Sequence, residues 1–111
     1  MLKKSIEKTF GRTPEALKFM DMEVNMGYKN AMIVTQRALN ELLPENERIS
    51  ADGKYGPKTK SAVASLQKDL GSQLLINSIK RQQRLYYDSL PKKDDYPGWE
   101  TRAAYDPIKE D

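Results

Sequence analysis

The chain of 111 residues contains neither cysteine nor histidine. Without cysteine, no disulfide and no thiolate nucleophile can form, and the redox compartment stays open. Without histidine, the commonest general base and the commonest transition-metal ligand are missing. Any catalysis would therefore have to use carboxylates, lysine or tyrosine.

Clustered carboxylates are also scarce. Only Asp94-Asp95 and Glu110-Asp111 lie next to each other, and no Asp-x-Asp-x-Asp-Gly loop occurs, so we expect no metal site and no cofactor. A glycosidase needs a buried acid about 5–10 Å from a second carboxylate. Asp21 and Glu23 lie on different faces of one expected helix, and no pattern indicates a buried, isolated glutamate. The residues themselves therefore predict no catalytic pair.

Long apolar runs are absent too. No run approaches the ~20 residues that span a membrane. The opening MLKKSIEKTF is basic but has no apolar stretch behind it, so we expect no signal peptide. Export would then require another route, such as lysis of the host or a dedicated delivery machine.

Charge is abundant and nearly balanced. Charged residues make up 32% of the chain, the net charge is +3 and the mean hydropathy is -0.79. The slight basic excess favours an anionic partner, although a solvated basic surface is the simpler interpretation. The same interpretation applies to the basic run on the last expected helix and beyond it (Lys80, Arg81, Arg84, Lys92, Lys93). No aromatic residues alternate with these, so nucleic acid is not expected.

The apolar spacing predicts helices throughout, and the 38% of apolar residues suits one modest core. Leu2, Ile6 and Phe10 predict a short helix in residues 1–12. Thr13-Pro14 is a helix start, and Gly27 is the expected stop, with Leu17, Met20 and Val24 predicted to face inward.

Three more helices are expected: about 31–43, capped by Asn30; 57–70; and 72–89, capped by Ser72. We therefore predict an all-α fold, a small orthogonal bundle of four to five helices, with at most a tiny hairpin at residues 52–53. Residues 1–12 form the N-terminal helix, 13–104 the domain and 105–111 a flexible tail. Trp99 is expected to fold back and close the core.

The stretch ADGKYGPKT, residues 51–59, is unusually elaborate. Asp52-Gly53 is typical of a tight turn that needs positive φ at glycine. Gly56 offers a second permissive position, and Pro57 suits the first position of the helix that follows. Most of this chemistry is interpreted as turn formation and capping. Tyr55 is different, because an exposed aromatic ring can either stack on a sugar or pack inward.

Residues 30–71 resemble the peptidoglycan-binding helical repeat, whose pattern is roughly V-x-x-L-Q-x-x-L-N, a loop, then D-G-x-[FY]-G-P-x-T-x-x-A-V-x-x-[FL]-Q. The matching positions are Val34, Gln36, Leu39, Asn40, Asp52, Gly53, Tyr55, Gly56, Pro57, Thr59, Ala62, Val63, Leu66 and Gln67.

The flanks resemble the C-terminal predicted peptidoglycan domain of phage-type muramidases, glycoside hydrolase family 108. FMDMEVNMG resembles that family's F-D-x-A-V-N-x-G, with Met20 and Glu23 departing from it. RQQRLYYDSLP and GWETR resemble the family's closing elements. The matching positions are Asp21, Val24, Asn25 and Gly27, then Arg84, Tyr87, Leu90, Pro91, Gly98, Trp99 and Arg102. The resemblance covers roughly residues 14–104.

The family's catalytic glutamate lies in an E-G-G-Y-like segment, which is not found here, and Glu7 has no supporting glycines. The resemblance therefore implies a non-catalytic module that binds peptidoglycan, with no catalytic residue and no cofactor. One alternative is the C-terminal part of a split or compact muramidase that acts with another chain. Another is a structural or interaction protein of a phage particle or secretion system that has lost wall binding.

Five residues are the candidate ligand-binding set: Asp21, Asn25, Gln36, Tyr55 and Trp99. Asp21 and Asn25 are four residues apart, so they share one helix face. In the muramidase relatives this helix borders the substrate cleft. Expected partners are peptidoglycan and a lytic, phage or secretion-system protein, with a homo-oligomer as a further alternative. The chain is expected in the cytoplasm when synthesised and at the cell wall or periplasm after lysis or delivery.

Overall fold

The computed structural model describes residues 13–90 and 103–108, and helices are the only regular secondary structure in these ranges. The elements are α2 (Pro14–Met26), α3 (Tyr28–Leu42), the short 3-10 helix η1 (Glu45–Glu47), α4 (Pro57–Leu70) and α5 (Ser72–Asp88). No strand occurs in the described part of the chain, so Asp52-Gly53 makes a turn without a hairpin. The all-α prediction is confirmed, while the helix expected in residues 1–12 lies outside the described residues.

The ends of α2 follow from local sequence. The Thr13 hydroxyl accepts a hydrogen bond from the Ala16 N–H at 3.3 Å, and Pro14 occupies the first helical position. Gly27 ends the helix with φ 85°, a left-handed conformation that glycine adopts without strain. Its N–H donates to the Glu23 carbonyl at 2.9 Å. These predicted boundaries are confirmed.

The expected caps of α3 and α5 were wrong. Tyr28 begins α3 directly after Gly27, so Asn30 already lies inside the helix. Its amide donates instead to the Met26 carbonyl at 3.0 Å, which satisfies one of the free carbonyls at the end of α2. Gly71, also at φ 85°, ends α4, and Ser72 begins α5 without a capping hydrogen bond from a side chain.

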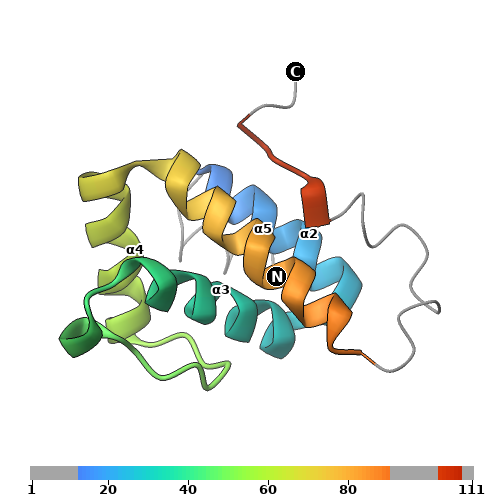
Figure 1. Ribbon diagram of the computed structural model, residues 1–111, viewed down its shortest axis with the longest axis horizontal. Coiled ribbons are helices and arrows are strands. Elements are labelled where there is room, and N and C mark those ends of the chain that lie inside the picture. Colours follow the sequence, from blue (N-terminus) through green and yellow to red (C-terminus); the bar gives the residue numbers. More distant parts are fainter. Residues whose placement is uncertain (1–12, 91–102, 109–111) are drawn as a thin grey trace.

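Helices α3 and α5 each contact the other three α-helices. In Figure 1, α3 and α5 lie side by side, and α4 stands across one end of both. The side chains that fill the space between them form one apolar cluster: Ala16, Phe19, Met22, Ala31, Met32, Val34, Ala38, Leu39, Leu43, Ala62, Val63, Leu66, Leu75 and Ile79. Removing these from water supplies the main driving force for folding.

The inner face of α2 differs from the prediction. Of the three residues predicted to face inward, Met20 is partly buried against the core, but Leu17 and Val24 are 51% and 78% exposed. Phe19 and Met22 are buried instead. The Phe19 ring meets the Tyr28 ring edge-on, with centroids 5.5 Å apart. Two apolar stripes compete on this helix, and the one with the aromatic contact to α3 is buried.

The segment 103–108 packs against the bundle. Ala103 is buried, and its carbonyl accepts a hydrogen bond from the Lys18 ammonium at 3.3 Å. Asp106 accepts from the Gln73 amide at 2.9 Å and pairs with Lys80 at 3.5 Å. Asp106 is only 6% exposed, and both of these partners lie on α5. The flexible tail predicted for residues 105–111 stays a prediction.

Candidate functional site

Two amide side chains on one face of α3, Gln36 and Asn40, position the segment that leads to α4. Asn40 forms a pair of hydrogen bonds with the backbone of Ile49, one to its carbonyl and one from its N–H, both at 2.8 Å. This pair holds residues 44–50 against the end of α3. Asn40 thus acts on the loop like a partner strand, by satisfying both backbone groups of one residue.

Gln36 holds the next part of the same segment. Its amide nitrogen donates to the Lys54 carbonyl at 2.9 Å, the Thr59 hydroxyl at 3.1 Å and, more weakly, the Asp52 carboxylate at 3.3 Å. Its carbonyl oxygen accepts from the Gly53 N–H at 2.9 Å. This one buried side chain therefore forms hydrogen bonds both with the loop of residues 52–54 and with the first turn of α4.

The turn itself is stabilised by Asp52 and Gly53. The Asp52 carboxylate also accepts from the Lys54 N–H at 2.9 Å, and this backbone hydrogen bond, followed by that of Gln36, holds the pKa of Asp52 below its usual value. Gly53 has φ 78°, and a Cβ at this position would lie 2.7 Å from Cγ of Lys29. Gly56, in contrast, is extended at φ -135°, so the expectation of a second special backbone position was wrong.

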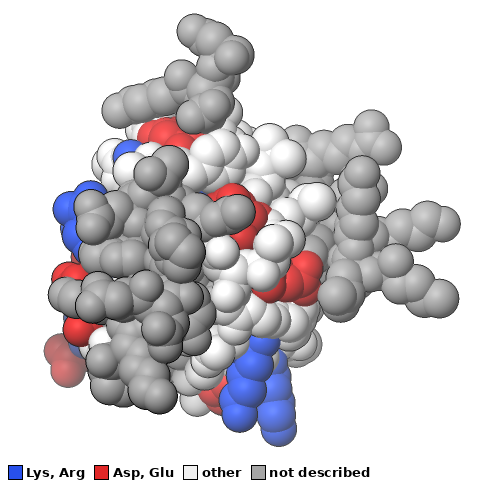
Figure 2. Space-filling model, turned by 90° about the vertical axis from the view of Figure 1, so that its right-hand side faces the viewer, with Lys and Arg blue, Asp and Glu red and all other residues white. Residues whose placement is uncertain are grey.

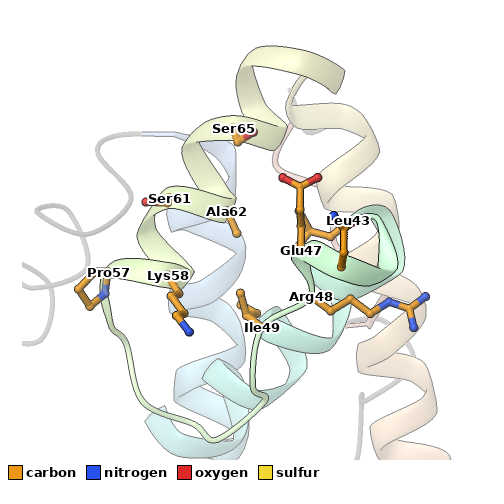
Figure 3. A pocket seen from close by; sticks show the side chains of 10 residues that line it. Leu43, Glu47, Arg48, Ile49, Pro57, Lys58, Ser61, Ala62 and Ser65 are labelled. Carbon is orange, nitrogen blue, oxygen red and sulfur yellow. The ribbon is translucent and has the colours of Figure 1, made fainter.

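A groove of about 460 Å³ lies between residues 43–49 and the first half of α4 (Figure 3). Its lining residues are Leu43, Asn46, Glu47, Arg48, Ile49, Pro57, Lys58, Ser61, Ala62 and Ser65. A second hollow of about 350 Å³ adjoins it toward the turn and shares Ile49, Pro57 and Lys58. Volumes of this order are typical of sites for small ligands.

The groove combines an apolar base with charges of both signs. In Figure 3, Lys58 and Ala62 project from α4 toward Ile49, while Glu47 stands on the opposite wall. The guanidinium of Arg48 points away from α4 at the rim. Among the described residues, the ion pairs are Lys80–Asp106 and Arg81–Glu41, so none uses a charge of this groove.

The structure separates the predicted site residues. Gln36 on α3 is fully buried, and Tyr55, in the loop that Gln36 holds, is half-buried against the core; neither lines the groove. Asp21 and Asn25 lie on α2 and do not line it either. The Asn25 amide nitrogen is buried without a hydrogen-bond partner. Trp99 lies outside the described residues.

Sequence reasoning missed the groove residues Glu47, Lys58, Ser61 and Ser65. All four are exposed polar residues, which carry no periodic signal. The available signal was indirect, since the conspicuous turn chemistry of residues 52–59 borders the groove. Sequence reasoning also missed a buried glutamate: Glu15 is 3% exposed, and its carboxylate accepts from the Gln67 amide at 2.9 Å.

The basic residues of α5 are partly engaged within the fold, since Lys80 pairs with Asp106 and Arg81 with Glu41 at 2.9 Å. Burial alone would raise the pKa of Glu41, but the hydrogen bonds from Ser78 and Arg81 together outweigh burial and lower this pKa. Figure 2 shows one face of the molecule, on which acidic side chains are separated by uncharged surface and basic ones lie toward its margins. No group of carboxylates in the described ranges is arranged to hold a metal ion.

None of the helices in residues 13–90 and 103–108 has the length and apolar character needed to cross a membrane.

Comparison with curated proteins and with solved structures gave no significant match. Residues 30–106 match the family described as "Predicted Peptidoglycan domain", a range that covers most of the chain and includes both walls of the groove. This chain belongs to the predicted peptidoglycan domain family.

Proposed function

We propose that this chain is a non-catalytic module that binds peptidoglycan in the groove between residues 43–49 and α4. The observation that carries the proposal is that the family match spans the whole groove together with Gln36 and Asn40, the two residues that position its walls. The groove is preformed, because hydrogen bonds from Asn40 and Gln36 hold both of its walls to α3. A preformed site loses less conformational entropy when it binds.

Under this proposal the chain acts at the bacterial cell wall. Tyr55, beside the second hollow, is a candidate for an additional contact at the rim, and Gln36 contributes through the loop that it holds. Asp21 and Asn25 remain a separate candidate contact on α2. The alternative partners are a lytic, phage or secretion-system protein and a second copy of this chain. No feature of the described surface favours one of them.

Sedimentation with purified peptidoglycan sacculi tests the proposal. The chain is expected to pellet with sacculi at low ionic strength and to remain in the supernatant without them. Ser65→Phe, which fills the groove, should weaken retention. Ala64→Phe adds the same ring at an exposed neighbour outside the groove and should not. Failure of the unmodified chain to bind sacculi would overturn the proposal.

The absence of cleavage is tested separately. A suspension of isolated cell wall should keep its turbidity when the chain is added, although the chain binds to it. Clearing by the chain alone would contradict the non-catalytic part of the proposal. In that case the buried Glu15 would be the first carboxylate to replace, as Glu15→Gln.

A further inference from the structure

We infer that the groove takes the stem peptide of peptidoglycan and not its glycan strand. This inference rests on the proposed function and names the ligand of the same site. The two parts of the polymer differ in chemistry: the glycan presents broad pyranose rings, hydroxyls and acetamido groups. The stem peptide presents methyl side chains, amides, carboxylates and, on its diamino acid, an ammonium group.

The apolar base of the groove fits the peptide. Leu43, Ile49 and Ala62 offer small aliphatic contacts, on which alanine methyl groups can be buried. No aromatic ring is among the described residues that line either hollow. A pyranose ring is commonly bound against an aromatic face, and neither hollow presents one.

The charges point the same way. Lys58 on α4 faces a ligand from one wall, and Glu47 on η1 from the other. Neither forms an ion pair with another described residue, so both are available to a ligand. A peptide that carries carboxylates and an ammonium group complements this pair, whereas an uncharged sugar leaves both charges unmatched.

Short polar groups complete the match to a peptide. Ser61 and Ser65 are spaced four residues apart on α4, so their hydroxyls follow the same wall of the groove. Side chains at this spacing lie about 6 Å apart, so their hydroxyls can donate to and accept from backbone amides two residues apart in an extended ligand. The wall thus offers hydrogen bonds along its length and a cation at its end.

Three probes distinguish the peptide from the glycan. The full chain is mixed with intact sacculi, with glycan strands from which an amidase has removed the stem peptides, and with free stem tetrapeptide as competitor. We expect retention on intact sacculi, a loss of about tenfold or more on stripped glycan, and release by the tetrapeptide. A chitin oligosaccharide should not release the chain.

Substitutions of two lysines on α4 test the role of the positive charge in the groove. Lys58→Ala should weaken binding of the tetrapeptide by about tenfold, and Lys58→Arg should retain most of it. Lys68→Ala removes the same charge from the far end of α4, outside the groove, and should leave binding unchanged. Binding should also weaken as ionic strength rises.

Two outcomes separate this inference from the proposed function. Equal retention on stripped glycan, or release by the oligosaccharide alone, would overturn the stem-peptide inference and leave wall binding intact. No retention on intact sacculi would overturn the proposed function itself. An unchanged affinity of Lys58→Ala for the tetrapeptide would contradict the assignment of Lys58.

Discussion

The side-chain amide of Gln36 lies 3.1 Å from the hydroxyl of Thr59, and this buried contact joins α3 to the first turn of α4. One turn further along α3, Asn40 holds Ile49 on the opposite side of the groove. The two walls are therefore positioned from a single helix.

Replacement of Gln36 by leucine should destabilise the fold strongly. The change keeps a similar volume but leaves the buried Gly53 N–H and the Thr59 hydroxyl without their partner. We expect a loss of about 2–4 kcal/mol in the free energy of unfolding, measured by urea denaturation. Arg37→Ala, at the exposed neighbouring position, should change it by less than about 0.5 kcal/mol. Equal stability of the two variants would contradict this account.

Alanine at Gly53 and at Gly56 should have opposite consequences. At Gly53 the backbone is left-handed and Lys29 leaves no room for a Cβ, so Gly53→Ala should destabilise by about 1–3 kcal/mol. At Gly56 the backbone is extended and no atom lies within 4 Å of the added Cβ. Gly56→Ala should therefore be neutral or stabilise by up to about 1 kcal/mol. Thermal unfolding of both variants checks the contrast, and a larger loss at Gly56 would refute it.

Stability should rise with pH between 7.5 and 9.5. Burial lowers the pKa of Lys18 from 10.5 to about 8, against the attraction of Asp21 and Asp106. In the unfolded chain Lys18 regains its ordinary pKa, so between about pH 8 and 10.5 the unfolded state binds more protons, and the free energy of unfolding increases with pH. Between pH 7.5 and 9.5 we expect the free energy of unfolding to increase by about 2 kcal/mol.

Urea denaturation of the wild type and of Lys18→Met at several pH values measures this effect. Methionine does not titrate, so the variant should lose the rise; a similar rise in both proteins would assign it to another group. The series should stop near pH 9.5. Burial, with Glu23, raises the pKa of Tyr28, so above that range ionisation of Tyr28 favours the unfolded state.

Helix ends were the most predictable feature of the fold. Thr13, Gly27, Pro57 and Gly71 act through their own dihedral angles or on groups within a few residues, and their positions follow from the chain alone. Asn30 shows the limit of this reasoning. It has the right chemistry for a cap, but the tight turn at Gly27 already places it inside α3, where it serves the preceding helix.

The candidate site was predictable only in part. Turn chemistry correctly identified Asp52-Gly53 as a turn with positive φ, and the family resemblance correctly singled out the segment around it. Which side chains line the groove was not predictable. Glu47 and Lys58 are ordinary polar residues in the sequence, and they line one groove only because Asn40 and Gln36 hold their segments to α3.

The sequence by itself determined the all-α class, the helix boundaries set by glycine, proline and threonine, and membership in the predicted peptidoglycan domain family. These depend on local conformational preference and on an ordered motif, both of which are properties of neighbouring residues. Only the tertiary structure decided which face of α2 is buried, that Glu15 and Lys18 lie inside, and where the groove forms. The burial of Glu15 and Lys18 depends on Gln67 and Ala103, 52 and 85 residues away, whose hydrogen bonds allow a polar group to be buried. The groove depends on the hydrogen bonds that Gln36 and Asn40 form with residues 9 to 23 positions further along the chain.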